Sequence, residues 1–381
     1  MKGAVLSVQD NLETTIIDFL KETLERDLVQ AVIVPKRVPS GDSFAYLVVR
    51  DPAILEGASP LPPVIPVQGA NAVSSLTRTG KNQKKILAVM HPCEIRAAIE
   101  LNKLKQADLD NLLFLSFDCP GVMPLSLYSE SPEKNDQIFG ESFQDRNSES
   151  MRPVCRMCTE FSRPASDIHI GLLGAEEGKV YLSPVSPEGE RVMNSLDLKL
   201  DFLLEGWEKE VEALKNERRE TRKTSYEALS LKIKGPDKLA ETFSGCINCH
   251  NCMRVCPICY CRQCYFESDA LKLPPENYLL RAEKKGSLRL PAETLFFHLG
   301  RMSHMILSCV SCGACEDACP MDIPVAQVFS LVADDAQRLF NYEPGRDKQE
   351  PLPTVVYREE EFREVEKPYS ETYLKGESKN V

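Results

Sequence analysis

The apolar residues in the first half of the chain recur at spacings that alternate between helix and strand. In residues 11–27 (NLETTIIDFLKETLERD) the apolar side chains fall on one helical face with acidic residues opposite, which predicts an amphipathic surface helix. Short apolar runs at residues 31–35 (AVIVP) and 44–49 (FAYLVV) predict buried strands. The sequence Pro-Ser-Gly-Asp between them predicts the turn that connects the two strands.

A strand, a helix and another strand follow in that order. Residues 85–90 (KILAVM) predict an apolar strand, a helical pattern begins at Glu94, and residues 112–117 (LLFLSF) predict a strand again. This order is typical of an α/β unit with parallel strands and a right-handed crossover. We therefore expect an α/β core domain with a mixed or parallel sheet and flanking helices.

The second half of the chain shows mainly helical periodicity. Apolar residues recur at helical spacing over residues 203–231, 291–307 and 324–339. Residues 128–151 are polar and poorly periodic, which predicts an exposed loop. After Tyr342 the chain is rich in charge and proline, so we expect an extended arm there.

Composition and charge narrow the class of protein. The chain has 381 residues, of which 43% are hydrophobic and 27% are charged, as in ordinary globular proteins with two or three domains. Its formal net charge of −11 argues against nucleic acid as a ligand. No stretch approaches the roughly 20 apolar residues of a spanning helix, and no signal peptide is recognisable. We expect a protein of the reducing cytoplasm, without direct membrane insertion.

Most of the fifteen cysteines belong to two runs of the form C-x2-C-x2-C-x3-C-P. This spacing wraps three thiolates around one iron–sulfur cube and sends the fourth to another cube, which predicts a bacterial-type ferredoxin module with two 4Fe-4S clusters. The expected ligation is crossed: Cys246, Cys249, Cys252 and Cys319 hold one cluster, and Cys309, Cys312, Cys315 and Cys256 hold the other. Zinc is the weaker interpretation, because its sites usually pair two C-x2-C knuckles or add histidines.

Four further cysteines lie in the α/β region. Cys93 follows the strand at 85–90 and Cys119 follows the strand at 112–117, so both are expected at the carboxyl edge of the sheet, where α/β folds bind ligands. Cys155 and Cys158 form a C-x2-C pair. Each cysteine alone is as easily a buried core residue, but together the four make a second kind of thiolate set.

Three more thiols, Cys259, Cys261 and Cys264, follow the first run. Because C-x-C-x2-C lacks a fourth ligand nearby, several interpretations stay open. The three could form a fourth metal site with His250, with Glu267 or with another subunit, or contribute to the core set, or bind no metal. His250 is expected to tune a cluster by hydrogen bonding and not to ligate it.

The order of these motifs resembles the beta-subunit family of deazaflavin-reducing hydrogenases and formate dehydrogenases. The resemblance rests on Pro92-Cys93, on Phe117-x-Cys119-Pro-Gly, on Cys155-x2-Cys158 and on residues 167–171 (DIHIG). The ferredoxin module placed after these motifs is similar to the formate dehydrogenase branch. The family's usual G-S/T-P-C stands here as Met-His-Pro-Cys, and no cysteine precedes Cys93.

The resemblance implies a core domain that binds FAD beside a 4Fe-4S cluster and exchanges electrons with a deazaflavin coenzyme. The four core cysteines would then hold a third cluster near the flavin. The small-residue segment 69–76 (GANAVSSL), which the family shares, could cradle flavin phosphates through Gly69, Ser74 or Ser75. An ordinary helix cap explains that segment equally well.

These predictions divide the chain into a flavin- and cluster-binding core domain at 1–235, a helix-padded ferredoxin domain at 236–340 and a tail at 341–381. The predicted function is that of an iron–sulfur flavoprotein subunit, which passes electrons between a hydride carrier, deazaflavin or NAD(P)H, and a catalytic redox subunit of a larger complex. The alternative is a flavin-free iron–sulfur conduit that docks one redox subunit onto another.

Overall fold

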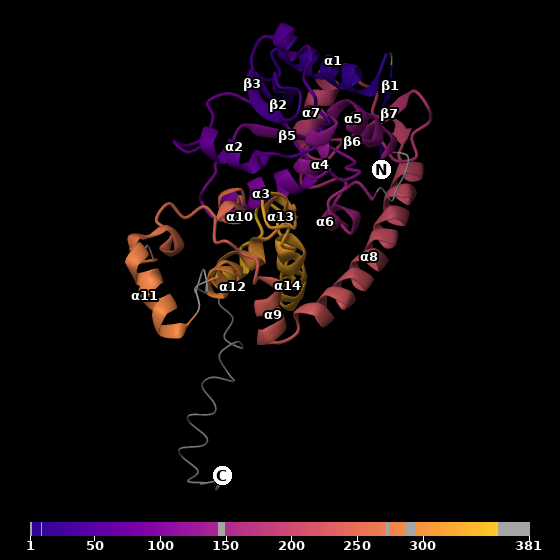
Figure 1. Ribbon diagram of the computed structural model, residues 1–381. Coiled ribbons are helices and arrows are strands. Elements are labelled where there is room, and N and C mark those ends of the chain that lie inside the picture. The colour runs from indigo at the N-terminus through magenta and orange to yellow at the C-terminus, as the bar shows by residue number, and fades with distance from the viewer. Residues whose placement is uncertain (1, 9, 144–148, 272–273, 287–293, 357–381) are drawn as a thin grey trace, which may run out of the picture. The chain divides into compact units, whose positions relative to one another are not determined.

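The computed structural model describes residues 2–8, 10–143, 149–271, 274–286 and 294–356 (Figure 1). Within the described residues, those up to 348 form one compact unit and residues 349–356 belong to another; the sheet and all the cysteines belong to the first. The domain limits expected at 235/236 and 340/341 stay predictions. Among the described residues, no helix is both long enough and apolar enough to cross a membrane.

The core of the first unit is a mixed sheet, which in the described residues has eight strands in the order β3-β2-β4-β5-β6-β7-β1-β8. Strands β2, β4, β5 and β6 run parallel, and the other neighbours pair antiparallel. The predicted α/β fold is confirmed. The strands are β1 (Lys2–Ser7), β2 (Ala31–Arg37), β3 (Phe44–Val49), β4 (Ile86–Val89), β5 (Leu112–Phe117), β6 (Ile168–Gly171), β7 (Lys179–Pro184) and β8 (Phe202–Leu203).

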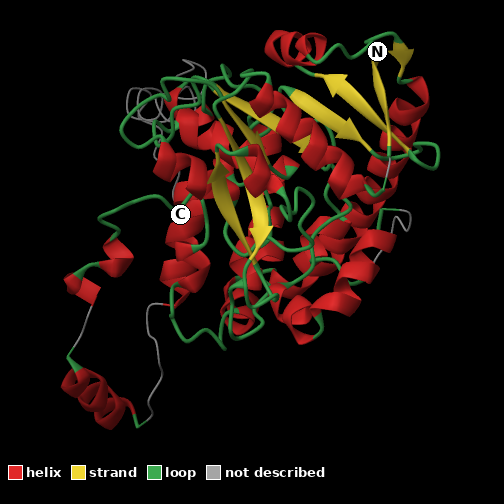
Figure 2. Cartoon of the chain, turned by 90° about the horizontal axis from the view of Figure 1, so that it is seen from above, coloured by secondary structure: helices red, strands yellow, loops and turns green. Residues whose placement is uncertain are grey.

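Helices flank this sheet on both sides (Figure 2). The α-helices are α1 (Leu12–Glu25), α2 (Gly69–Leu76), α3 (Pro92–Lys103), α4 (Leu125–Glu130), α5 (Pro132–Glu141), α6 (Pro153–Arg156), α7 (Pro187–Ser195), α8 (Glu205–Ile233), α9 (Pro236–Thr242), α10 (Asn251–Arg254), α11 (Pro275–Lys285), α12 (Thr294–Met305), α13 (Ala314–Asp317) and α14 (Val325–Leu339). Short 3-10 helices are η1 (Pro52–Leu55), η2 (Tyr265–Glu267), η3 (Asp269–Leu271), η4 (Ile306–Ser308) and η5 (Pro353–Val355).

Strand β5 is buried at every position, because helices cover both faces of the sheet. Leu113, Leu115 and Phe117 join the apolar cluster that contains α1 and α7. Leu112 and Phe114 join the cluster that contains α2 and α3. Alternate residues of a strand point to opposite faces, so one continuous apolar run serves two layers.

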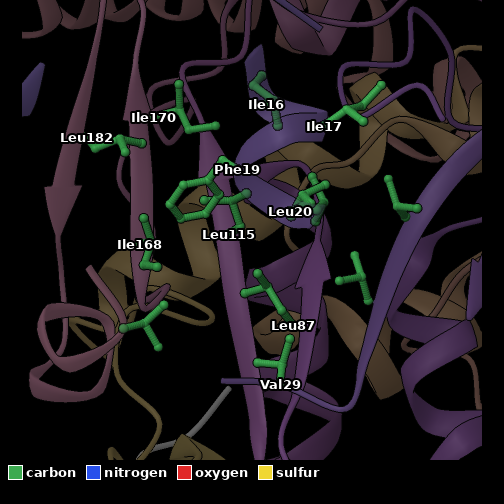
Figure 3. Packing of buried hydrophobic residues seen from close by; sticks show 14 of the residues in the cluster. Ile16, Ile17, Phe19, Leu20, Val29, Leu87, Leu115, Ile168, Ile170 and Leu182 are labelled. Carbon is green, nitrogen blue, oxygen red and sulfur yellow. The ribbon is translucent and has the colours of Figure 1, made fainter. Parts of the chain in front are cut away.

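Helix α1 forms where the amphipathic pattern predicts it. The Asn11 side chain caps its first turn by accepting a hydrogen bond from the Thr14 amide at 2.8 Å. Ile16, Phe19 and Leu20 then pack against the sheet (Figure 3). The helices expected near 203–231 and 324–339 are α8 and α14, and α12 lies within the helix expected at 291–307, of which residues 291–293 are outside the described part.

Helix α3 begins at Pro92, two residues before the position that the sequence pattern indicated. Proline is favourable at a first helical position because no amide partner is lost there. The Glu94 carboxylate also accepts a hydrogen bond from the His91 amide at 3.0 Å. Cys93 therefore lies in the first turn of a helix at the carboxyl edge of the sheet.

The exposed loop predicted at 128–151 is wrong for its described first part. Helices α4 and α5 occupy most of residues 125–141, and Tyr128 and Phe139 are buried. The Tyr128 hydroxyl donates to Asp136 at 2.8 Å, and Asp136 also pairs with Arg37 at 2.7 Å. These tertiary contacts stabilise helices whose sequence has weak periodicity.

The cysteine runs lie on a separate apolar cluster built from α9, α10, α12 and α14, with Phe243, Met253, Phe297 and Phe329 among its buried members. The start of the predicted tail packs on α3. There the Tyr342 hydroxyl and the Gly345 amide donate to Glu100 Oε1 at 2.6 and 2.8 Å. Residues 357–381 of the predicted tail lie outside the described residues.

Replacing Leu20 by Ala should lower the free energy of unfolding by about 2–5 kcal/mol, because Leu20 is fully buried between α1 and the sheet. The measurement is anaerobic urea unfolding followed by far-ultraviolet circular dichroism. Leu47→Ala on the edge strand β3 removes the same atoms from a side chain that is 38% exposed, so it should cost under about 1 kcal/mol. Equal losses would contradict the packing described here.

Candidate iron–sulfur sites

The two cysteine runs follow the same backbone path. Asn248 and His250 have φ angles of 56° and 61°, and Ser311 and Gly313, at the corresponding places of the second run, have 55° and 80°. A one-turn helix, α10 or α13, follows in each case. Left-handed residues in such loops turn amides toward a bound anion, and the Asn248 amide indeed lies 3.4 Å from Cys246 Sγ.

The structure brings the first crossed set together. Burial raises the pKa of the Cys246 thiol, and the thiols of Cys319 and Cys249 raise it further. Burial also raises the pKa of Cys252, to about 11, and the same neighbours contribute. Cys319 comes from the end of the second run, so this is the arrangement that crossed ligation requires.

The second crossed set lines a single pocket. Cys256 reaches it from the first run, and Cys309, Cys312 and Cys315 reach it from the second. Met305, Val310 and Phe329 form apolar walls of the same pocket. Burial raises the pKa of Cys309 to about 11, although the Ser311 amide partly opposes the shift. Four convergent thiols in one pocket suit a 4Fe-4S cluster, in which each iron takes one thiolate.

Arg301, on α12, supplies a buried positive charge at the first set. Its side chain is 2% exposed, and its Nη1 and Nη2 donate to Cys252 Sγ and to the Cys252 carbonyl at 3.1 and 3.0 Å. The guanidinium also lies 4.9 Å from the centre of the Phe329 ring. A buried cation is costly unless negative charge lies close to it, so this contact fits an anionic cluster.

The four core cysteines also converge. Cys93 is in the first turn of α3, Cys119 follows β5, and Cys155 belongs to α6. Burial raises the pKa of Cys119, and the Cys155 and Cys158 thiols add to the shift. Burial raises the pKa of Cys93 well above its usual value, with Cys119 and Cys155 among the groups that reinforce it.

The core set lies directly beside the second crossed set. The Cys312 thiol is the neighbour that raises the pKa of Cys93 most after burial itself. Arg152 lies at this junction: it donates to the Cys312 carbonyl at 3.2 Å and to Asp317 at 2.6 Å. Its charge lowers the pKa of both Cys155 and Cys312. A side chain at Gly313 would collide here, since its Cβ would lie 2.8 Å from Val154.

Asp118 anchors the strand end that carries Cys119. It is buried and accepts hydrogen bonds from Ser162, from His169 Nε2 and from the indole of Trp207, the last at 2.7 Å. Burial alone would raise the pKa of Asp118, but the hydrogen bonds from His169, Ser162 and the Leu173 amide outweigh burial and lower this pKa. Trp207, on α8, therefore helps to fix the loop beside the core set.

His91, Arg152 and Arg301 are site residues that the sequence analysis missed. His91 Nδ1 lies 3.3 Å from Cys119 Sγ, and burial lowers the pKa of this imidazole to about 3. The only sequence signal for His91 was its place in Met-His-Pro-Cys. Nothing in the spacing of the arginines indicated that their side chains would reach the cysteines.

The thiols of Cys259, Cys261 and Cys264 do not converge. Cys256 and Cys259 each lie within 3.9 Å of Met305 Sδ, Cys264 contacts Met253, and Cys261 is exposed. Within the described parts of the chain, no three Cys, His, Asp or Glu side chains are close enough to hold a single metal ion. An iron–sulfur cube does not need its ligands to meet at a single metal ion, because each thiolate binds its own iron. A fourth metal site stays a prediction.

His250 and Glu267, the other candidates for that site, pair with each other. His250 Nδ1 lies 2.9 Å from Glu267 Oε1, and the imidazole stacks on the Phe297 ring at 4.3 Å. His250 therefore contacts a carboxylate and an aromatic ring.

The residues predicted to contact a flavin have other partners. The Gly69 amide donates to Glu94 Oε1 at 2.6 Å, and the Ser74 hydroxyl donates to the Gln106 carbonyl at 2.7 Å. Ser74 and Ser75 line a pocket next to the first ferredoxin run in which cationic side chains outnumber carboxylates; it is called the basic pocket below. A flavin contact at these residues stays a prediction, and the Gly69 amide is already engaged.

A different cleft opens at the carboxyl edge of the sheet. It lies between the ends of β1 and β2, the start of α1, and α5, and its walls include Glu13, Arg37, Phe44, Phe139 and Phe143. Leu172 also lines it, and the Leu172 amide donates to Asp118 beside Cys119. Aromatic walls with a few charged groups at this edge are typical of a cofactor site in an α/β fold.

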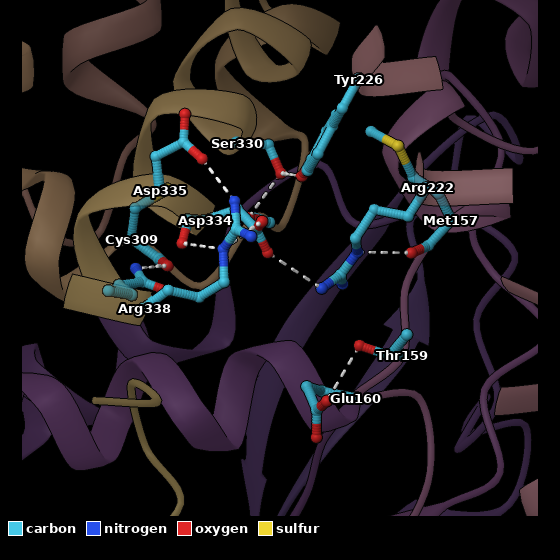
Figure 4. Close-up of polar contacts among 12 residues, drawn as sticks. Met157, Thr159, Glu160, Arg222, Tyr226, Cys309, Ser330, Asp334, Asp335 and Arg338 are labelled. Atoms are coloured by element: carbon cyan, nitrogen blue, oxygen red, sulfur yellow. Dashed lines mark hydrogen bonds and ion pairs between the residues drawn. The ribbon is translucent and has the colours of Figure 1, made fainter. Parts of the chain in front are cut away.

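A polar network beside the core set joins α8 to α14 (Figure 4). Arg222 donates to the Met157 carbonyl at 3.1 Å and pairs with Asp334 at 3.5 Å. Tyr226 and Ser330 share a hydrogen bond of 2.8 Å. Cys158 and Cys309 line the pocket around this network, so the same contacts fix one cysteine of each neighbouring set.

Comparison with known proteins identifies relatives both of the cysteine runs and of the longer chain. Residues 214–323 match the family described as the 4Fe-4S dicluster domain. The beta subunit of an F420-dependent formate dehydrogenase from Methanocaldococcus jannaschii is 28% identical, over 70% of this chain and 76% of that protein. The beta subunit of F420-dependent formate dehydrogenase 1 from Methanococcus maripaludis is 26% identical, over 70% and 74%.

Among solved structures, a chain of the F420-reducing NiFe hydrogenase complex from Methanosarcina barkeri aligns with a TM-score of 0.45 and 12% identity, over 62% of this chain and 94% of that one. The resemblance that the motifs predicted is confirmed by the sequence relatives. The chain carries a 4Fe-4S dicluster domain and is similar to the beta subunits of F420-dependent formate dehydrogenases.

Proposed function

We propose that this chain is the electron-transfer subunit of a cytoplasmic redox complex, in which FAD and 4Fe-4S clusters connect a hydride carrier with a catalytic subunit. The observation that carries the proposal is the proximity of the core cysteine set to the second crossed set: Arg152, whose charge lowers the pKa of Cys155, donates to the Cys312 carbonyl at 3.2 Å, and Cys312 is the thiol that raises the pKa of Cys93 most. The relatives are subunits of formate dehydrogenases that depend on F420. Candidate partners are therefore a formate dehydrogenase, a hydrogenase or a heterodisulfide-reductase-type complex.

The second crossed set has each of the other two cysteine sets as a neighbour. The core set of Cys93, Cys119, Cys155 and Cys158 neighbours the second crossed set at Cys312. That set in turn neighbours the first, because the Cys252 thiol contributes to the raised pKa of Cys315. Clusters in this order would give one continuous path from the carboxyl edge of the sheet to the ferredoxin region.

We place FAD in the cleft at the carboxyl edge, close to the core set. When bound there, FAD would exchange a hydride with the carrier and single electrons with a cluster. The chain's own contribution is to bind and orient it. Phe44, Phe139 and Phe143 offer apolar walls that exclude water. Arg37 and Lys179, which pair with Asp136 and Glu176, are the cations that line the cleft.

The flavin-free conduit remains the second candidate because of one observation. The Gly69 amide, expected to meet a flavin phosphate, instead donates to Glu94. Such a protein would keep all three cysteine sets and would pass single electrons only. Its partners would be two redox subunits and no hydride carrier.

Protein purified without oxygen should release about one FAD per chain on acid treatment, and reduced deazaflavin or NAD(P)H should bleach its visible iron–sulfur absorption. The measurement combines flavin fluorescence with anaerobic absorption spectra. Phe139→Ala should lower flavin content several-fold, whereas Phe340→Ala, at a side chain that is 42% exposed beyond α14, should not. A protein with full iron content that neither contains nor takes up FAD would favour the conduit.

Arg152→Gln should lower the reduction potential of the neighbouring clusters by about 40–80 mV, which corresponds to about 1–2 kcal/mol for a one-electron couple. Reduction adds negative charge, and the buried Arg152 guanidinium beside Cys155 and Cys312 stabilises that charge. The measurement is a redox titration followed by electron paramagnetic resonance. Arg152→Lys keeps the charge and should shift the potential less.

Asp317→Asn is the matched control, because it breaks the same buried ion pair from the other side. It removes a negative charge, so it should raise the potential where Arg152→Gln lowers it. A purely structural role for the pair would shift both variants in the same direction, and that result would contradict the electrostatic role.

Glu13→Gln should change how stability depends on pH. Burial raises the pKa of Glu13 to about 7, although Arg37 opposes the shift. Because the folded state favours the protonated carboxyl, wild type should lose about 2–3 kcal/mol of stability between about pH 4.5 and 7 relative to the variant. Urea midpoints at pH 5 and 8 test this. Glu25→Gln, an exposed position on α1, should follow wild type, and equal behaviour of both variants would contradict the assignment.

A further inference from the structure

The basic pocket that contains Ser74 and Ser75 lies away from the flavin cleft. It is formed by the ends of α2 and α3 and by the segment after α10, that is, by chain ends on the amino side of the parallel strands. Four cationic side chains line it: Arg78, Lys105, Arg254 and Arg262. All four are exposed, so the pocket presents its charge to solvent.

Cations outnumber carboxylates in the lining of this pocket, and among the described residues three of the four cations are unpaired. Arg78, Lys105 and Arg262 form no ion pair with any residue that the structure describes, and Arg254 shares Glu267 at 3.3 Å with His250. Two carboxylates also line the pocket. Asp110 lies 4.0 Å from Lys81, and Asp108 accepts from the Asp110 amide at 2.9 Å. The result is a positive patch on a chain whose net charge is −11.

The pocket reaches the cysteines of the second crossed set. Cys256 and Cys259 form part of its wall, and Cys256 lines the pocket of Cys309, Cys312 and Cys315 on its other side. A molecule bound in the basic pocket would therefore be separated from that cluster site by a single cysteine side chain. Unpaired cations beside Cys256, a predicted cluster ligand, indicate that an anionic redox partner docks here.

A protein suits this pocket better than a nucleotide cofactor. Nucleotide and flavin sites enclose their ligand with apolar and aromatic surface, whereas this pocket is wide and lined largely by polar side chains. Its aromatic side chain, Tyr260, is itself 38% exposed. Exposed arginines around a shallow pocket steer an acidic surface over several ångströms and leave room for its side chains.

We propose that this basic pocket is the docking site of a small acidic one-electron carrier protein of the ferredoxin type. The inference rests on the proposed function, because it needs a cluster held by Cys256. One electron passes between the reduced centre of the carrier and the oxidised cluster, with no bond made or broken and no proton transferred. The docking site gives the subunit a one-electron entry or exit separate from its hydride carrier.

The test uses a recombinant acidic plant-type 2Fe-2S ferredoxin as the probe. Reduced ferredoxin is mixed with the oxidised, full-length protein in an anaerobic stopped-flow instrument, and the second-order rate constant is measured at low and high salt. The variant Arg78→Gln/Lys105→Gln/Arg262→Gln should lower the rate constant about tenfold at low salt and about twofold at high salt, because salt screens the attraction. Reduced methyl viologen, a cation, should reduce variant and wild type at similar rates.

The control variant Lys209→Gln/Lys223→Gln/Lys232→Gln removes the same charge from exposed positions on α8 and should keep the ferredoxin rate within about twofold. Equal slowing by both triple variants, or slowing that viologen shares, would overturn the docking site. Loss of FAD from the pocket variant would also overturn it, in favour of a flavin phosphate site. A wild-type protein whose clusters viologen cannot reduce would overturn the proposed function, and this inference with it.

Discussion

Buried negative charge is the constraint on which the rest of this structure depends. Thiols from distant parts of the chain are gathered in neighbouring sets, and burial raises the pKa of most of them, including Cys93 and Cys315. Iron–sulfur clusters held by thiolates need nearby donors or cations to offset that charge. Arg152 and Arg301 supply the offsetting positive charge from inside the protein. Each of them also donates to a backbone carbonyl. Without such partners, either arginine would be a costly unpaired charge.

The fold brings these groups together by placing α3 between the sheet and the cysteine runs. The first turn of α3 carries Cys93, and its last turns carry Glu100, which binds the chain again at Tyr342 and Gly345. Val310 and Cys312 pack into the same apolar cluster as α3. The helix is therefore a rigid spacer that fixes the distance between the core set and the second crossed set. Rigid spacing matters because electron transfer needs a fixed separation and no large motion.

The sequence predicted the parts of this arrangement that depend on local spacing. The C-x2-C-x2-C-x3-C-P repeats indicated two equivalent loops, and the amphipathic period of residues 11–27 indicated α1. What the sequence could not indicate depends on tertiary contact. Helix α5 has weak periodicity and is stabilised by the ion pair between Asp136 and Arg37. Arg152 and Arg301 look like ordinary charged residues in the sequence, and only folding brings them to the sulfur atoms.

Positive charge serves this acidic chain in two ways that differ in range. Arg152 and Arg301 are buried, so little solvent screens them and their effect falls on the cysteines beside them. Arg78, Lys105 and Arg262 are exposed, so salt screens them within about 10 Å and they act on partners that approach. Because the chain carries a net charge of −11, an acidic partner would be repelled from most orientations and attracted to the basic pocket. In the function and docking site proposed above, cationic side chains would both set cluster potentials and select a docking face.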